Sequence, residues 1–289
     1  MKILGTYKNG NYLVGIFDDG TKVRTTKENE FIPEFPECMD IKITNYCDKK
    51  CPYCHEASST EGKHGDILNV EFINTLKPYT ELAIGGGNPL SHPDIKEFLE
   101  LLKSKNIIAN MTVNQSHFEQ NESYIEMLVK EDLIKGLGIS LINPTEDFIS
   151  KVKKYPNAVL HVINGIVKIE DLEKLYDQNL KVLILGYKQF RKGKEFYSLE
   201  VESNKNKLYE KLEEMTKHFK VVSFDNLALE QLKVKRLMSD VEWNEFYMGN
   251  DGSFTMYIDL VNRQFAKCSV SDVRYDLLDD IKEMFKIIR

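Results

Sequence analysis

Between residues 39 and 224, short β-prone runs alternate with amphipathic helical stretches, and this alternation limits the possible folds more than any other feature of the chain. A repeated strand–helix rhythm predicts a parallel sheet covered by its crossover helices. Six successive units of this kind, counted from the first strand, predict an α/β fold with a partial (β/α)6 TIM-type barrel. The predicted strands span residues 39–45, 81–85, 107–113, 136–142, 158–164, 180–187 and, with a weaker pattern, 220–224. In the clearest helical stretch, apolar side chains recur at the spacing of one helix face, namely Ile95, Phe98, Leu99 and Leu102.

Three cysteines follow the first predicted strand in a C-x3-C-x2-C pattern: Cys47, Cys51 and Cys54. Thiolates are soft ligands that select zinc, copper(I) or iron–sulfur clusters, and a loop this short is able to wrap three of them around one centre. A structural metal site uses four protein ligands, whereas a catalytic site keeps one position for water, substrate or cofactor. In α/β barrels the chemistry gathers beyond the C-terminal ends of the strands, where this loop lies. The loop is therefore the first candidate for a functional centre.

The loop, with Tyr53 directly before its last cysteine, resembles the cluster motif of the radical S-adenosylmethionine (radical SAM) superfamily. The resemblance implies a 4Fe-4S cluster on Cys47, Cys51 and Cys54, with S-adenosylmethionine (SAM) bound to the iron that no cysteine holds. It further implies reductive cleavage of SAM to a 5′-deoxyadenosyl radical that abstracts hydrogen from a substrate, with a flavodoxin- or ferredoxin-type protein as reductant. The superfamily is built on a six-unit partial barrel, which agrees with the strand–helix alternation.

Later strand ends supply further candidate cofactor contacts. Gly86, Gly87, Asn88 and Pro89 resemble the G-G-E-P segment that holds the amino group of SAM in the superfamily, although Asn88 replaces the usual glutamate. The Asn88 amide oxygen still accepts a hydrogen bond but carries no charge. The resemblance assigns further cofactor contacts to Tyr53, Asn114, Ser140 and Asn164. By position alone, such polar residues are equally ordinary loop and cap residues.

The substrate stays open between two classes. A peptide or protein would lie against the terminal strands, whereas a nucleoside or nucleotide would be drawn to the cationic loop 186–194. Within this loop Lys188 is the candidate for binding the cofactor carboxylate or a substrate anion, and a solvated loop is the competing interpretation. The alternative from another class is a zinc-stabilised binding module without catalysis, with His55, His64 or Cys268 as the fourth ligand.

The remaining cysteines carry no assigned chemistry. Cys38 is expected to be a small buried hydrophobic residue. Cys268 stands alone beyond the loop, so the ligands for an auxiliary cluster are lacking, and a buried or idle thiol is expected there. The six histidines show no mutual spacing typical of a metal site.

Segments on both sides of the barrel predict small antiparallel β additions that flank or cover its mouth. Residues 1–37 predict a β-meander and an extended linker, with turns at Asn9-Gly10 and Asp19-Gly20. Residues 226–289 predict helix, a hairpin across 260–263, and a final helix. The expected domain boundaries are therefore 1–37, 38–225 and 226–289.

Composition excludes several classes of function. A formal net charge of −6 argues against general nucleic-acid binding. No apolar run approaches the ~20 residues that span a bilayer, so no membrane association is expected. The sequence shows no secretory leader pattern, and five cysteines in 289 residues do not form a disulfide framework, so the expected location is cytoplasmic.

Overall fold

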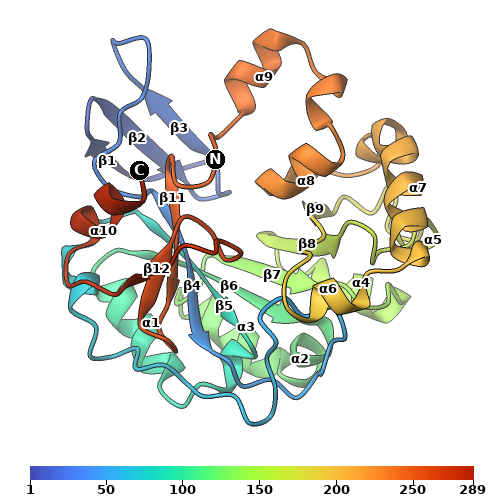
Figure 1. Ribbon diagram of the computed structural model, residues 1–289, viewed down its shortest axis with the longest axis horizontal. Helices are drawn as coiled ribbons and strands as arrows, with labels where there is room; N and C mark the ends of the chain where they lie inside the picture. The colour runs from blue at the N-terminus through green and yellow to red at the C-terminus, as the bar shows by residue number, and fades with distance from the viewer.

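The computed structural model describes residues 1–289, and its centre is a curved ten-stranded sheet with the order β10-β9-β8-β7-β6-β5-β4-β11-β12-β13 (Figure 1). From β4 to β10, each strand pairs in parallel with its neighbour in the chain. The two outermost strands do not pair with each other, so the barrel is partial, and the predicted fold class is confirmed. The strand bounds are β4 (Cys38–Thr44), β5 (Glu81–Gly86), β6 (Ile108–Asn114), β7 (Gly136–Ser140), β8 (Ala158–Ile163), β9 (Lys181–Leu185) and β10 (Val221–Phe224).

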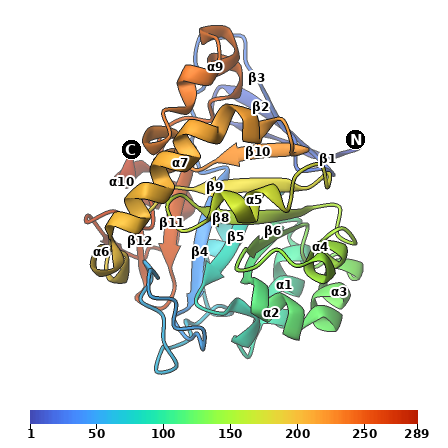
Figure 2. The same cartoon turned by 90° about the vertical axis from the view of Figure 1, so that its right-hand side faces the viewer.

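Helices cover the outer face of this sheet, as Figure 2 shows. The apolar stripe predicted for the stretch after Ser91 is fully buried on α1, which confirms the helix and its inward face. None of the helices is both long and apolar enough to cross a membrane. The helix bounds are α1 (Ile95–Ser104), α2 (Gln115–Gln120), α3 (Glu122–Lys130), α4 (Glu146–Val152), α5 (Ile169–Glu173), α6 (Lys192–Phe196) and α7 (Leu199–Thr216).

The first crossover differs from the regular rhythm. Between β4 and β5 the chain forms a long loop and the short 3-10 helix η1 (Glu71–Thr75) in place of an α-helix. The reason is visible in the backbone, because the loop folds back on the end of β4. Asn45 N donates to Lys63 O at 2.8 Å, and Gly65 N donates to Ile43 O at 2.8 Å. The first part of this segment therefore builds the mouth of the barrel, while Phe72 and Ile73 of η1 pack into the main apolar core.

Alternation along β4 separates the helix-covered face of the sheet from the inside of the barrel. Met39, Ile41 and Ile43 have almost no exposed surface and belong to the main apolar core. Asp40 and Lys42, at the intervening positions, line the interior cavities. Successive side chains of a strand point to opposite faces, so this polar pattern marks the inner face.

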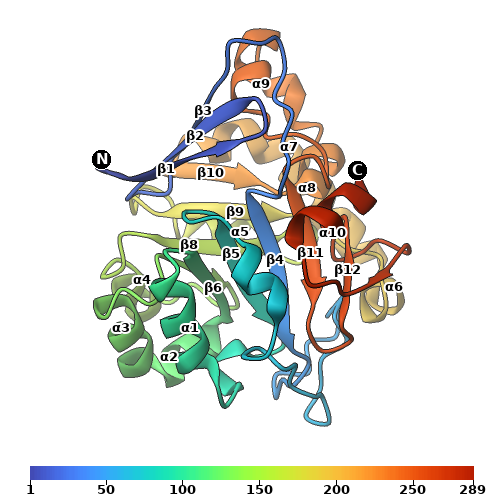
Figure 3. The same ribbon diagram turned by 90° about the vertical axis from the view of Figure 1, so that its left-hand side faces the viewer.

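The C-terminal segment joins the main sheet. β11 pairs in parallel with β4, with Tyr257 opposite Asp40 and Asp259 opposite Lys42, and it forms the predicted hairpin with β12 (Figure 3). The expectation of a purely antiparallel C-terminal addition was therefore wrong at β11. The physical reason is the edge of β4, whose backbone groups would otherwise be unpaired. The bounds are α8 (Asn226–Gln231), η3 (Val234–Leu237), α9 (Asp240–Phe246), β11 (Thr255–Asp259), β12 (Gln264–Ala266), β13 (Tyr275–Asp276) and α10 (Ile281–Ile288).

The N-terminal meander is a separate antiparallel sheet of β1 (Ile3–Asn9), β2 (Tyr12–Phe17) and β3 (Lys22–Thr25). The turns predicted at Asn9-Gly10 and Asp19-Gly20 are both present between these antiparallel strands. The sheet lies at the end of the barrel opposite the cysteine loop (Figure 3). Its Lys22 Nζ is 2.6 Å from the carboxylate of Glu81, the first residue of β5. The expectation that it flanks or covers the mouth was therefore wrong, while the three domain boundaries remain predictions.

Candidate active site

The three cysteines of the loop line one cavity of about 400 Å³ at the C-terminal ends of the barrel strands. Each thiol is half-buried. The loop is held by its own backbone, since Cys54 N donates to Cys51 O at 3.2 Å and Cys47 N donates to Ser59 O at 2.8 Å. The fold thus presents the three sulfur atoms to the same enclosed space.

The electrostatics of the thiols reflect both burial and proximity. Burial, followed by the charges of Cys54 and Cys47, raises the pKa of Cys51. Burial is also the largest cause of the raised pKa of Cys47. Without a metal the thiols of Cys47 and Cys51 therefore hold their protons, and binding of a metal centre would release these protons.

Glycines at the end of β5 let this strand approach the cysteine loop. Gly86 has a φ of +112°, and a Cβ added there would lie 2.4 Å from Thr44 O. A Cβ at Gly87 would lie 2.1 Å from Tyr46 O. The Gly87 backbone N–H also donates to Thr44 O, at the end of β4, at 2.8 Å. Both positions require glycine on steric grounds.

Most of the cofactor contacts predicted from the sequence meet at this cavity, but three do not. The lining includes the cysteines together with Tyr53, Gly86, Gly87, Asn114, Ser140 and Lys188. Asn88 instead caps the short helix η2 (Pro89–Ser91), because its Oδ1 accepts from Leu90 N at 3.2 Å. Pro89 is buried as the first residue of η2. Asn164 points towards α8 and donates from Nδ2 to Gln231 Oε1 at 3.0 Å.

The cationic loop after β9 is partly turned inwards. Lys188 Nζ lies 2.9 Å from Ser269 Oγ and 3.5 Å from His55 Nε2. Arg191 Nη1 donates to the backbone oxygen of Glu56 at 2.9 Å. Two of the four cations in 186–194 thus contact the protein, which leaves less positive surface for an anionic substrate than the sequence indicated.

A buried ion-pair network connects the cysteine loop to neighbouring strands of the sheet. Lys42 Nζ lies 2.9 Å from Glu56 Oε2 and 3.2 Å from Asp259 Oδ2, and its side chain is 2% exposed. Tyr257 OH donates to Glu56 Oε1 at 3.1 Å. Because Glu56 follows Cys54 by two residues, the network joins the cysteine loop to β4 and β11. Sequence reasoning missed it, although the polar residues alternating with apolar ones along 39–44 marked the inner face.

His161 on β8 also lines the cavity and was missed. Burial lowers its pKa to about 4, so the imidazole is neutral at physiological pH. Gly138 on β7 provides the space for the ring, since an added Cβ would lie 2.6 Å from His161 Cε1. The sequence signal that could have identified His161, as for Lys42, was a polar residue within an otherwise apolar strand.

One histidine lies beside the cysteine loop. His117 Nε2 is 2.6 Å from Asp48 Oδ1, and ligand atoms of Cys47, Asp48 and His117 all lie within 4.8 Å of one another. Sequence spacing gave no indication of this contact, because 69 residues separate His117 from Asp48.

Comparison with known proteins agrees with this geometry. Residues 41–178, which contain the cysteine loop and the strands β5 to β8, match the model of the Radical SAM superfamily. Residues 41–178 therefore form a Radical SAM superfamily domain. Members of this superfamily bind SAM and an iron–sulfur cluster, so the family implies both cofactors for this chain.

Two similar curated proteins differ in what they act on. A probable GTP 3′,8-cyclase of Methanocaldococcus jannaschii is 28% identical over 140 residues, covering 46% of this chain and 45% of the relative. The PqqA peptide cyclase of Gluconobacter oxydans is 25% identical over 85 residues, covering 28% of this chain and 24% of the relative. The chain thus matches less than half the length of either radical SAM relative.

Among solved structures, SuiB of Streptococcus suis bound to its precursor peptide SuiA has a TM-score of 0.56 at 16% identity. The alignment covers 88% of this chain and 65% of SuiB. SuiB bound to S-adenosylmethionine has the same TM-score and identity, with 85% of this chain and 64% of SuiB covered. These similarities show that the two proteins share the fold.

Proposed function

We propose that this radical SAM protein holds a 4Fe-4S cluster on Cys47, Cys51 and Cys54 and uses SAM to abstract hydrogen from a substrate inside the barrel. The observation that carries the proposal is the shared cavity, which brings three thiols of one loop together with the ends of β5, β6 and β7. When bound, the cluster and SAM supply a 5′-deoxyadenosyl radical, formed when an electron enters the sulfonium and methionine leaves. A low-potential flavodoxin or ferredoxin is the proposed source of that electron.

The zinc alternative needs a fourth protein ligand beside the three cysteines, from His55, His64 or Cys268. Cys268 does not line the cofactor cavity, and His64 Nδ1 lies 2.9 Å from Thr44 Oγ1. His55 does line the cavity, with Lys188 Nζ 3.5 Å from its Nε2, so the zinc alternative depends on this residue. The match of residues 41–178 to the Radical SAM superfamily supports an iron–sulfur centre.

The chain's own residues bind and orient the cofactor in this proposal. Gly86, Gly87, Asn114 and Ser140 line the cavity. Backbone carbonyls of the two glycines would accept from the amino group of SAM, and the Ser140 and Asn114 side chains would bind its other polar groups. Lys188 is placed to meet a carboxylate, since its Nζ reaches Ser269 and His55 across the same cavity. His161, which is neutral at physiological pH, also lines the cavity and would reduce the space left for water around a bound substrate.

Anaerobic reconstitution tests the proposal directly. Purified protein given iron and sulfide should turn brown, bind iron and sulfide in equal amounts, and release 5′-deoxyadenosine from SAM after reduction with dithionite. Cys51→Ala should lose both the colour and the product, because a two-cysteine loop no longer holds the cluster. Cys38→Ala is the matched control, since Cys38 begins β4 and does not line the cavity. Zinc in the anaerobically purified protein, or product formation by Cys51→Ala, would reject the proposal.

A further inference from the structure

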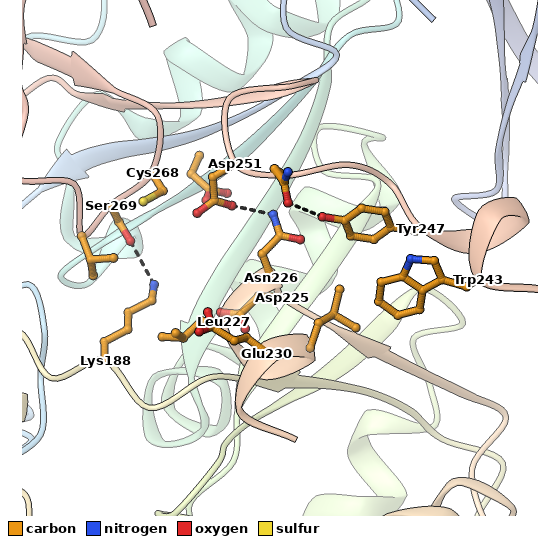
Figure 4. Close-up of a pocket in the computed structure, with 14 residues that line it drawn as sticks. Lys188, Asp225, Asn226, Leu227, Glu230, Trp243, Tyr247, Asp251, Cys268 and Ser269 are labelled. Atoms are coloured by element: carbon orange, nitrogen blue, oxygen red, sulfur yellow. Dashed lines mark hydrogen bonds between the residues drawn. The ribbon is translucent and has the colours of Figure 1, made fainter. Parts of the chain in front are cut away.

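A second cavity, of about 580 Å³, lies beside the cofactor cavity in the open side of the barrel. Its walls come from β4, α8, α9 and the chain after β12, that is, from the two edges that the partial barrel leaves apart. Figure 4 shows these side chains converging on one space. Asp40, Lys188 and Ser269 line both cavities, so the second one opens directly onto the site where the radical would form.

The charge of this cavity is strongly negative. Four carboxylates line it, from Asp40, Asp225, Glu230 and Asp251, against the single ammonium of Lys188. Lys188 already donates to Ser269 Oγ at 2.9 Å. An anionic ligand such as a nucleotide phosphate would therefore be repelled from this space.

The carboxylates are only partly satisfied within the protein. Asp251 Oδ1 accepts from Asn226 Nδ2 at 2.6 Å, and Asp225 Oδ1 accepts from the backbone N–H groups of Gly186 and Ala228, each at 2.8 Å. Asp40 and Glu230 form neither a hydrogen bond nor an ion pair through their carboxylates. Desolvation raises the pKa of Asp40 and of Asp225, which makes their charged forms less favourable than in bulk water, while Glu230 and Asp251 are exposed. A cation in the cavity would compensate these charges.

The far wall is aromatic and apolar. The ring of Trp243, on α9, stacks on the ring of Tyr247, which directly follows this helix. The ring centroids are 4.8 Å apart and the interplanar angle is 19°. Leu227, Leu229 and Val270 also line the cavity. An aromatic face beside carboxylates suits a long aliphatic stem that ends in a positive charge, because the stem packs on the rings while the head pairs with the acids.

We propose that this cavity binds the lysine or arginine side chain of a peptide substrate and so places a neighbouring residue of that peptide in the lumen for hydrogen abstraction. The catalytic part of this inference rests on the proposed function, because the SAM-derived radical would act in the barrel interior. The size, negative charge and aromatic wall of the cavity, together with its opening onto the cofactor site, carry the assignment of an ammonium or guanidinium group.

Trp243 makes the proposal measurable, because it is the only tryptophan of the chain and lies in the cavity wall. The reconstituted holoenzyme with SAM is titrated with the blocked tripeptides acetyl-Gly-Lys-Gly-amide and acetyl-Gly-Glu-Gly-amide and with GTP, and tryptophan fluorescence is followed. We expect a saturable change with the lysine peptide that weakens as salt screens the charges. The glutamate peptide and GTP should produce none.

Two isosteric variants locate the binding. Asp251→Asn and Glu230→Gln should each raise the Kd of the lysine peptide about two- to fivefold, as expected for the loss of one exposed charge contact. Glu213→Gln, which removes an exposed charge from α7 outside the cavity, is the control and should leave the Kd unchanged. An equal response to both peptides, no response to either, or unchanged binding by both cavity variants would overturn the proposal.

The outcome is separable from that of the proposed function. Cys51→Ala should lose 5′-deoxyadenosine formation and still bind the lysine peptide, because Cys51 lines only the cofactor cavity. Peptide binding without any SAM cleavage by the wild-type holoenzyme would reject the radical chemistry and leave the cation site standing. SAM cleavage without selective peptide binding would reject the cation site and leave the radical chemistry standing.

Discussion

His161 has no hydrogen-bond partner within the protein and a pKa lowered to about 4 by burial, so its protonation should couple folding to pH. In the unfolded chain its pKa is about 6.5, so the unfolded state takes up the proton first as pH falls. Stability is therefore complete above about 6.5 and is lost between 6.5 and 4. The loss attributable to this one residue is about 2 kcal/mol at pH 4.5.

The variant His161→Gln should remove this contribution. Urea unfolding of the metal-free chain, followed by circular dichroism at pH 7 and pH 4.5, measures the difference in unfolding free energy between the two conditions. That difference should be about 2 kcal/mol smaller in the variant than in the wild type. Equal pH dependence of the two proteins would show that the ring is not desolvated in solution.

Lys42 is the nearest cation to the carboxylates of Glu56 and Asp259, at 2.9 and 3.2 Å, whereas Arg191 Nη1 lies 3.6 Å from Glu56 Oε2. Lys42→Met removes the charge and keeps the volume, leaving Glu56 and Asp259 buried without their partner. We expect a loss of about 3–5 kcal/mol in unfolding free energy, measured in urea. Lys130→Met is the matched control, because Lys130 pairs with Glu126 at the surface and should change stability by less than about 1 kcal/mol. Similar losses in the two variants would contradict the role of the buried network.

At the scale of elements, the end of β5 depends on two glycines and tolerates change at a third. Gly87→Ala places a methyl group against Tyr46 O, so the strand end must move away from the cysteine loop. We expect a loss of about 1–3 kcal/mol in unfolding free energy, together with weaker iron retention after reconstitution. Gly85→Ala is the control for stability, since an added Cβ there meets nothing within 4 Å. Greater destabilisation by the Gly85 change would contradict this geometry.

The elements were predictable where local periodicity specifies them. Every strand from β4 to β10 and the buried stripe of α1 follow from apolar spacing within a short window. The parallel pairing of β11 with β4 was not predictable, because local pattern does not say which distant strand a hairpin will join. The same limit applies to the site. The strand-end residues were found, but the Lys42–Asp259 and Asp48–His117 contacts join residues 217 and 69 positions apart.

At the scale of the whole molecule, the last quarter of the chain completes the sheet. Removing residues 226–289 would expose the edge of β4, take Asp259 away from Lys42 and uncover the core around Ile258 and Phe265. We expect the fragment 1–225 to aggregate or to unfold without a cooperative transition. Size-exclusion chromatography and a thermal melt measure this. A monomeric fragment with a sharp melt would instead support the boundary at residue 225 as a true domain limit.

The pairing of β11 with β4 also determines when the site is able to form during translation. A ribosome adds about 5–20 residues per second, so the carboxylate of Asp259 emerges roughly 10 to 40 seconds after the lysine that it meets. During that interval the cysteines have already been made but the base of their loop is not yet assembled. Cluster assembly factors should therefore act only after β11 has been synthesised, and nascent chains stalled before β11 should carry no iron.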